Sequence, residues 1–381
     1  MRRKELICLG LLLLLGLLFA LPHAFSAVQW TPDGLFYEVQ KRQVQGMSRD
    51  AAMESVFESD LAEPLKQEER DQPMRLRGVD NPRWVEYSSR FYERRWTVPV
   101  MAALIAPIAG TRSLELVSLF AFALLPALLY LLLRRRFAPE VAAASSAFCA
   151  LLPPLFVLAP HPSTDSWGLA LLIVGLIVAL KARDGGLRWL PVWVLVVLML
   201  SFTRDATLVL LTATALLAFR ERSRRMAVLL GSGVLASLPA PLIFSVPVRD
   251  SLAYALNDFR VPPDTTWGAI IGEYPSGLLS VVRSDIAFPL HTGVPVLVFA
   301  MGAIAIAGLI ALLVSGTRRQ PLETLAIGSA IGAALTVALA VNYTALRLEL
   351  VFVPSVAVGV ALLAERLLAY RRERISLTAA G

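Results

Sequence analysis

The stretch LICLGLLLLLGLLFALPHAF, residues 6–25, decides the fold, because it holds no Asp, Glu, Lys or Arg. An apolar helix of about 20 residues spans the roughly 30 Å hydrocarbon core of a bilayer. Further apolar runs follow along the chain, so we predict an all-α polytopic membrane protein with about ten transmembrane helices. The other runs are residues 114–133, 141–158, 167–180, 189–202, 206–219, 226–246, 294–314, 322–341 and 348–368.

The composition supports this class and excludes others. Apolar residues make up 56% of the 381 residues and charged residues only 17%, against about 25% in soluble domains. With a mean hydropathy of +0.64, this excludes a disordered chain, a coiled coil and a soluble nucleic-acid-binding domain, so no nucleic-acid partner is expected. The two cysteines, Cys8 and Cys149, lie in apolar runs, which excludes a disulfide framework and a cysteine zinc site.

The basic residues predict the orientation. With ten spans and a cytoplasmic N-terminus, every basic cluster falls inside, as the positive-inside rule requires. Both termini are then cytoplasmic, and residues 28–97 and 247–291 lie outside an inner (plasma) membrane. The N-terminal run also resembles a cleaved signal peptide, but it exceeds the usual core of about 7–15 residues, which favours a retained anchor. The basic clusters are residues 2–4, 134–136, 181–188, 220–225, 318–319 and 366–374.

Two shorter features complete the domain organisation. The run at residues 98–110 contains two prolines and is too short to cross a bilayer, so we predict a re-entrant or interfacial segment. In the first outer segment Met53, Val56, Phe57 and Leu61 recur at helical spacing, which predicts a surface helix. The chain then divides into a membrane module at 1–246, a second outer segment at 247–291 and C-terminal membrane helices at 292–381.

Asp33 is the first candidate for chemistry. It lies in WTPDGLFYE, residues 30–38, directly after the first span and close to Tyr37 and Glu38. A carboxylate held near lipid can act as a general base, since desolvation raises its pKa. The same position suits a helix N-cap, and both interpretations stay open at this point.

Further polar residues stand at the outer ends of other spans. His161 and Asp165 lie in the turn HPSTDSW, where Asp165 either faces the same cavity as Asp33 or caps the next helix. Arg204 and Asp205 join two spans almost without a loop, so Arg204 either pairs with an acid or binds a phosphate. Arginines before the short run suit a lipid phosphate headgroup or interfacial anchoring. The remaining candidates are Arg94, Arg95, Tyr343 and Arg347.

Taken together, these features resemble the GT-C class of integral-membrane glycosyltransferases. The resemblance lies in an early acidic outer loop, a return segment before the second span, short acidic and arginine-bearing turns and a late outer turn. It covers residues 6–246 best. The stretches that carry it are TPDGLFYE, RFYERRWTVPVMAALIAP, HPSTDSWGLALL, FTRDATLVLL and NYTALRLELVFVP.

The resemblance implies transfer of a sugar from a polyprenyl-phosphate donor to an acceptor glycan, lipid or protein at the extracytoplasmic face. It makes Asp33 the general base, and it gives Asp165 the role of positioning the acceptor or binding a divalent cation, Mg or Mn. Many members carry paired acids in an outer loop, whereas Asp165 and Asp205 stand singly, so no metal ligand set is assigned. The donor phosphate would be held by Arg94, Arg95, Arg204 and Arg347, with Tyr37, Glu38, His161, Asp205 and Tyr343 elsewhere in the pocket.

Two other functions stay open. A transporter or flippase would place ionisable residues near the bilayer midplane in broken helices, and Pro153-Pro154 does interrupt one run. The runs otherwise hold almost no ionisable residues, which favours an enzyme acting at the membrane surface. A non-catalytic scaffold would require neither Asp33 nor Arg204.

The orientation can be tested by labelling single cysteines. We expect a cysteine at Ser59 or Thr266 to react with a membrane-impermeant maleimide in intact cells, because both positions lie outside. A cysteine at Ser223 should react only after the cells are permeabilised. Labelling at Ser223 in intact cells would contradict the orientation.

Overall fold

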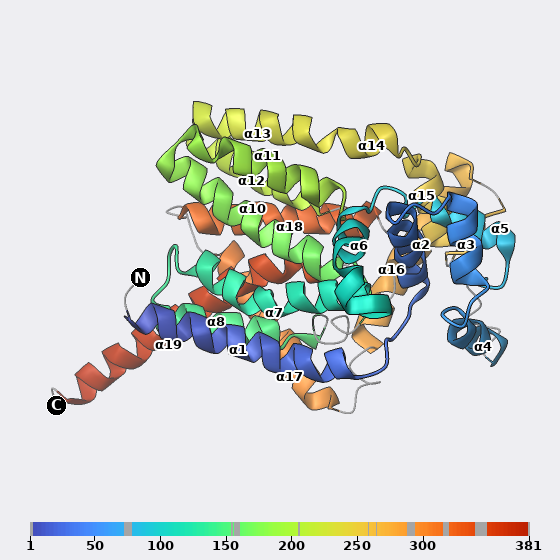
Figure 1. Cartoon of the computed structure of the whole chain (residues 1–381). Coiled ribbons are helices and arrows are strands. Elements are labelled where there is room, and N and C mark those ends of the chain that lie inside the picture. The colour runs from blue at the N-terminus through green and yellow to red at the C-terminus, as the bar shows by residue number, and fades with distance from the viewer. Residues whose placement is uncertain are drawn as a thin grey trace.

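A computed structural model of the chain shows an all-helical protein (Figure 1). The part of the chain that it describes contains no β-strand, which confirms the predicted all-α class. The described residues are 3–71, 78–153, 155, 161–204, 206–257, 259–263, 265–287, 294–314, 320–339 and 349–379.

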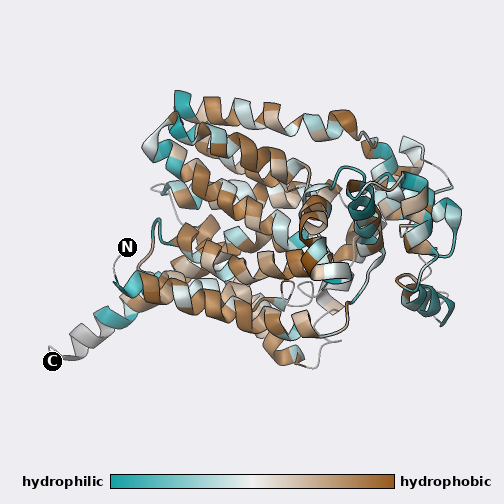
Figure 2. Cartoon of the chain, in the orientation of Figure 1, coloured by the Kyte–Doolittle hydropathy of each residue, from teal (hydrophilic) through white to brown (hydrophobic). Residues whose placement is uncertain are grey.

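Seven helical segments are long and apolar enough to cross a membrane, so the chain is a polytopic membrane protein. Figure 2 shows the apolar residues concentrated in this bundle of long helices. The segments are Arg3–Phe25 (α1), Thr97–Leu133 (α6 and α7), Asp165–Gly185 (α10), Arg224–Ile243 (α13 and α14), Pro295–Leu313 (α17), Pro321–Leu339 (α18) and Leu350–Glu373 (within η5 and α19, Val353–Ala379).

Three of the ten expected spans are shorter helices. These are α8 (Pro139–Ala150) and α11 (Leu190–Ser201), with 12 residues each, and α12 (Thr207–Glu221), with 15. At about 1.5 Å per residue they measure roughly 18–23 Å, less than a hydrocarbon core of about 30 Å. The count of ten spans therefore stays a prediction.

The core of the bundle lies around α7 (Ser113–Leu133) and α10, whose side chains are mostly buried. Tyr130 of α7 and Trp193 of α11 are among the largest fully buried side chains. α12 packs along α18, and α17 packs along α19. By contrast, α1 and α17 expose most of their apolar residues, as expected for helices that face lipid.

The predicted short segment at 98–110 forms a separate helix, α6 (Thr97–Ala109). Gly110 ends it with a φ of 60°, and the chain reverses through η2 (Gly110–Arg112) into α7. Val98 and Ala102 consequently pack against Leu114 and Val117 at the start of α7. At about 20 Å, α6 is too short to cross alone, and its place at the membrane surface stays a prediction.

The described parts of the two segments predicted to lie outside pack together into one unit, made of α2–α5 and α15, which we call the outer unit. Trp84 Nε1 donates to the carbonyl oxygen of Phe259 at 2.7 Å, and Phe91 stacks on Tyr254 at 4.5 Å. The predicted surface helix is α3, with Val56 buried in the unit's own apolar core. The helices of the unit are α2 (Pro32–Val44), α3 (Arg49–Phe57), α4 (Glu63–Asp71), α5 (Pro82–Ser89) and α15 (Val248–Leu256), with α16 (Trp267–Ala287) following.

An ion pair also links the two outer segments. Arg90 donates to Asp250 at 3.1 Å, beside the ring of Tyr87. Burial, and then the nearby Asp250 carboxylate, raise the pKa of Tyr87 above its usual value, and Arg90 opposes them. Tyr87 therefore stays neutral over the physiological pH range.

Ion pairs tie helices together at the opposite end of the bundle, where α1 begins and α19 ends (Figure 1). Arg134 after α7 pairs with Glu5 of α1, and Arg136 pairs with Glu365 of α19 at 3.0 Å. Arg183 of α10 pairs with Glu221 of α12. The basic clusters of these helices thus share one end, the arrangement that the orientation argument needs.

Two glycines allow α17 and α19 to pack at backbone contact. A Cβ on Gly308 would lie 2.8 Å from the backbone nitrogen of Val360, and one on Gly359 would meet the carbonyl oxygen of Gly308. Real Cβ atoms do not approach this closely, so any larger residue must separate the helices.

We therefore expect Gly308→Ala to lower the stability of the protein in detergent by about 1–3 kcal/mol through overpacking. Gly302→Ala on the same helix is the matched control, because a Cβ there meets nothing within 4 Å. Thermal unfolding followed by light scattering or intrinsic fluorescence measures both variants. Equal midpoints for the two would show that α17 and α19 do not pack in this way.

Candidate functional site

Asp33 lies in the first turn of α2, where the outer unit meets the bundle. The helix is capped by Thr31, whose Oγ1 accepts a hydrogen bond from Gly34 N at 3.1 Å. The alternative that Asp33 is the N-cap is therefore wrong. The Asp33 side chain is buried, with only 5% of the residue exposed.

A tyrosine orients the Asp33 carboxylate. Tyr92 Oη donates to Asp33 Oδ1 at 2.6 Å. The Tyr92 ring stacks on Phe36 with centroids 4.6 Å apart, and it meets the ring of Tyr37 edge-on at 5.7 Å. Because Phe36 and Tyr37 follow Asp33 on the same helix, α2 both carries the carboxylate and fixes the residue that binds it.

Tyr37 connects this carboxylate to two other segments of the chain. Arg95 Nη1 donates to Tyr37 Oη at 2.9 Å, and its guanidinium lies over the Tyr92 ring at 5.2 Å. Tyr37 Oη also lies 3.2 Å from Thr164 Oγ1, a fully buried hydroxyl in the turn before α10. The first outer segment thus contacts the turn before α10 through the phenol of Tyr37.

Asp165 begins α10 and forms an ion pair with Arg204, which follows α11. The pairing interpretation of Arg204 is the one that the structure shows. Both side chains are largely buried, with 1% of Asp165 and 11% of Arg204 exposed. Gly168 makes room for the arginine, because a Cβ there would lie 3.2 Å from Arg204 Cβ.

Backbone contacts hold these segments in place. Ser118 Oγ of α7 donates to the carbonyl oxygen of Ser163, and Ser163 N donates back at 3.1 Å. Thr97 N donates to the carbonyl oxygen of Phe202 at 3.2 Å. The polar cluster is therefore built on the ends of long helices, which limits its motion relative to the bundle.

The structure places the other predicted residues differently. Glu38 lies about 140° around α2 from Asp33, in a buried ion pair with Lys41 at 2.6 Å and a further one with Arg42. His161 Nδ1 lies 3.2 Å from the carbonyl oxygen of Gln29, at the edge of the cluster. Arg94 is partly buried in the segment that leads to α6. The candidates Asp205, Tyr343 and Arg347 lie outside the described residues.

Two cluster residues were not among the sequence candidates. Tyr92 lies in the stretch RFYERRW, in which the sequence candidates are Arg94 and Arg95. Thr164 occupies the position before α10 but makes no side-chain cap, and its hydroxyl contacts Tyr37 instead. An aromatic residue among paired arginines, five residues before a short apolar helix, was the available signal for Tyr92.

The cluster offers little support for a metal ion. Among the residues that the structure describes, no three His, Cys, Asp or Glu side chains come together as ligands. Asp165 is already paired with a guanidinium, and divalent cations such as Mg prefer several oxygen ligands. The described residues of the cluster thus offer no ligand set for a divalent cation, and because Asp205 lies outside them, a cation at this site stays a prediction.

Comparison with known protein-family models gives no match, and comparison with curated protein sequences gives none either. Function therefore rests on the geometry. Two buried carboxylates, Asp33 and Asp165, and two buried or stacked guanidinium groups, Arg95 and Arg204, occur in one cluster at the junction of the bundle and the outer unit. Such a set can accept a proton at Asp33 and bind an anion at Arg95, whereas Arg204 is already paired with Asp165.

Removal of the Tyr92 hydroxyl should destabilise the outer unit. We expect Tyr92→Phe to cost about 2 kcal/mol, since hydrogen bonds to a carboxylate contribute roughly 1.5–3 kcal/mol. Tyr87→Phe is the matched control, because Tyr87 Oη is buried without a hydrogen-bond partner among the described residues. Thermal unfolding of both purified variants gives the comparison, and equal losses of stability would contradict the Tyr92–Asp33 contact.

Proposed function

We propose that the chain is a GT-C-like membrane glycosyltransferase that uses a polyprenyl-phosphate-linked sugar at the extracytoplasmic face. The observation that carries the proposal is the buried Asp33 carboxylate, held by Tyr92 beside Arg95 and within the cluster that contains Asp165 and Arg204. A hydroxyl acceptor needs a base, and a phosphate leaving group needs cations, so both requirements of glycosyl transfer are represented.

The reaction then proceeds as a displacement at the anomeric carbon. The acceptor hydroxyl gives its proton to Asp33, and its oxygen forms a bond to the anomeric carbon of the donor sugar. The bond from that carbon to the phosphate oxygen breaks, and the electron pair leaves with the polyprenyl phosphate. Arg95 and Arg204, together with the sequence candidates Arg94 and Arg347, stabilise the negative charge on that phosphate.

The proposal includes ten membrane crossings. α11 and α12 run between the outer cluster and the end of the bundle where Arg183 of α10 and Glu221 of α12 pair. α11 leads from one end of the bundle to the other and α12 leads back, so we count them as two crossings although each helix is short. α8, which ends at Ala150, is likewise counted as a crossing and brings the number to ten. Both termini would lie in the cytoplasm, and the outer unit would lie outside the inner membrane.

A transporter is less well supported. Several charged residues described within the long spans lie close to helix ends: Glu115 in the first turn of α7, Glu323 in the first turn of α18, and Arg183 in the last turn of α10. Glu365 lies further inside α19, where it pairs with Arg136. Transport sites instead place ionisable groups near the bilayer midplane. The charge distribution therefore favours chemistry at a membrane surface over transport through the midplane.

Asp33→Asn tests the role of the carboxylate. Because Thr31 caps α2, the substitution should leave the helix intact while it removes the base. We expect the transfer of labelled sugar from a polyprenyl-phosphate donor in membranes to fall about 10²–10⁴-fold. Expression and membrane insertion should match wild type.

Asp50→Asn provides the matched control, since Asp50 occupies the first turn of α3 in the same outer unit but is exposed. Its activity should equal that of wild type. Arg204→Lys keeps the charge but loses the guanidinium fork, so it should weaken use of the donor. Full activity in Asp33→Asn would refute the proposed mechanism and shift the weight to a transporter or scaffold.

A further inference from the structure

The helix α16 (Trp267–Ala287) has 21 residues and lies where the bundle meets the outer unit (Figure 1). It is long enough to cross a bilayer, but it is not among the seven segments of the described chain that are also sufficiently apolar. Its side chains instead divide into three lengthwise faces, which can be followed at about 100° per residue.

The first face of α16 packs on the protein. Ile270, Gly277 and Val281 are buried and Tyr274 is partly buried, and the four residues fall within an arc of about 60° around the helix. Ile270 packs against Leu252 of α15. This face therefore joins α16 to the outer unit.

The second face of α16 is apolar and exposed. It consists of Trp267, Ile271, Leu278 and Val282, which lie within another arc of about 60° and extend about 22 Å along the helix. Ile271 is 69% exposed, and the other three residues are between 38% and 52% exposed. We call these four residues the apolar stripe. It ends before Asp285, near the C-terminal end of the helix.

The third face of α16 is polar. Glu273, Ser276, Ser280 and Arg283 are all exposed and share an arc of about 80° on the side opposite the apolar stripe. An exposed apolar stripe opposite a charged and polar face is typical of helices that lie in the surface of a bilayer.

A contact with α18 sets the depth of α16. Tyr274 Oη donates to the carbonyl oxygen of Ala338 at 2.8 Å, one residue before the end of α18, which is among the seven candidate spans. The first turn of α18 lies at the basic end of the bundle, where Glu323 pairs with Arg136 at 3.5 Å. The middle of α16 therefore lies at the opposite end of a helix long enough to cross the membrane, level with the boundary of the bilayer.

We propose that α16 is an interfacial helix, whose apolar stripe inserts into the lipid bilayer at the level of the headgroups while its polar face stays in water. Trp267 supports lipid as the occupant, because tryptophan is enriched at membrane–water interfaces. The depth given by Tyr274 supports it too, since lipid already surrounds the bundle at this level. The inference does not depend on the proposed enzyme activity.

Insertion of α16 would anchor the outer unit to the membrane surface. α16 packs on α15, and Tyr254 of α15 is hydrogen-bonded through its hydroxyl to Ser88 of α5 at 2.7 Å. Phe91, two residues after α5, stacks on the same tyrosine. The contact with lipid is thus transmitted through packed side chains to the segment that carries Tyr92 and Arg95.

Nitroxide spin labels on single cysteines measure the depth of each face directly. Ile271→Cys and Leu278→Cys place the label on the apolar stripe, and Ser276→Cys and Ser280→Cys place it on the polar face as matched controls. The full-length protein, with both native cysteines replaced by alanine, is reconstituted into vesicles of phosphatidylcholine and phosphatidylglycerol. EPR power saturation then compares collisions with oxygen, which concentrates in lipid, and with nickel–EDDA, which stays in water.

We expect oxygen to relax the labels at Ile271 and Leu278 more than nickel–EDDA does, and the order to reverse at Ser276 and Ser280. Because all four side chains are exposed, the labelled proteins should unfold at the midpoint of the unlabelled protein, and the two positions on each face test the proposal independently.

Two results would overturn the proposal. Stronger relaxation by nickel–EDDA at all four positions would place the apolar stripe in water. Labels on the stripe that neither reagent reaches would show that protein covers it, and spin–spin broadening between these labels would identify that protein as a second copy of the chain.

Discussion

The need to satisfy every backbone polar group within lipid governs this structure. In hydrocarbon an unpaired N–H or C=O costs several kcal/mol, so the chain crosses as helices and turns only near the surfaces. The charged residues of the described cluster stand at helix ends. Asp33 lies in the first turn of α2, Arg95 precedes α6, Asp165 begins α10, and Arg204 follows α11. The constraint that shapes the bundle thus also gathers polar side chains from distant parts of the sequence.

Burial of the charged pairs costs free energy of desolvation. Removing the Asp165–Arg204 pair from water costs free energy that their mutual attraction only partly returns, and an apolar pair of similar volume would often be as stable. The same holds for Glu38 and Lys41, which are buried in the outer unit. The two pairs differ in their surroundings. Glu38 and Lys41 belong to one helix and stabilise it locally, whereas Asp165 and Arg204 join two helices at the junction where Tyr37, Arg95 and Thr164 also meet.

The sequence predicted the class of fold and several residues of the candidate site. It did not predict where helices end or which aromatic residues contact the site. Hydropathy located the apolar runs, but it carries no information on where a helix stops. The breaks after Ala109 and Ala150 therefore left the number of crossings open. Asp33 was identified from its place after the first span. The cap at Thr31 and the hydrogen bond from Tyr92 could not be, since they depend on the exact start of α2 and on a contact 59 residues away.

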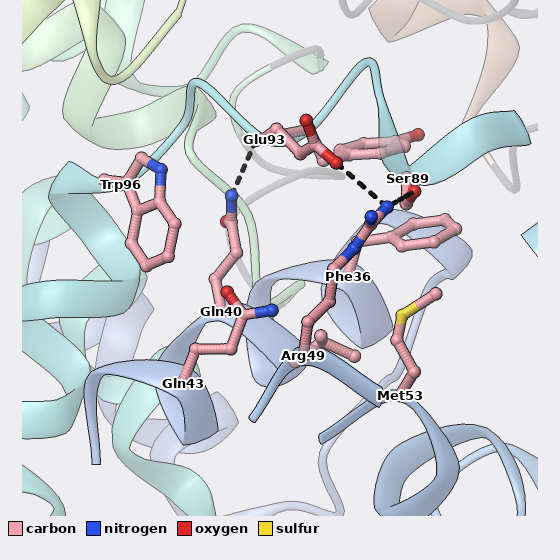
Figure 3. A pocket seen from close by; sticks show the side chains of 10 residues that line it. Phe36, Gln40, Gln43, Arg49, Met53, Ser89, Glu93 and Trp96 are labelled. Atoms are coloured by element: carbon pink, nitrogen blue, oxygen red, sulfur yellow. Dashed lines mark hydrogen bonds and ion pairs between the residues drawn. The ribbon is translucent and has the colours of Figure 1, made fainter. Parts of the chain in front are cut away.

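Tyr92 divides the outer unit into two electrostatic environments. On the side of the bundle it contacts Asp33 and Arg95, and beyond them lies the Asp165–Arg204 ion pair. On its other face the ring stacks on Phe36, with centroids 4.6 Å apart. The Arg49–Glu93 ion pair lines the same small hollow as Tyr92 (Figure 3), so the charges on this side are matched. Because the Tyr92 hydroxyl donates to Asp33, a shift of this ring would also change its contact with the carboxylate.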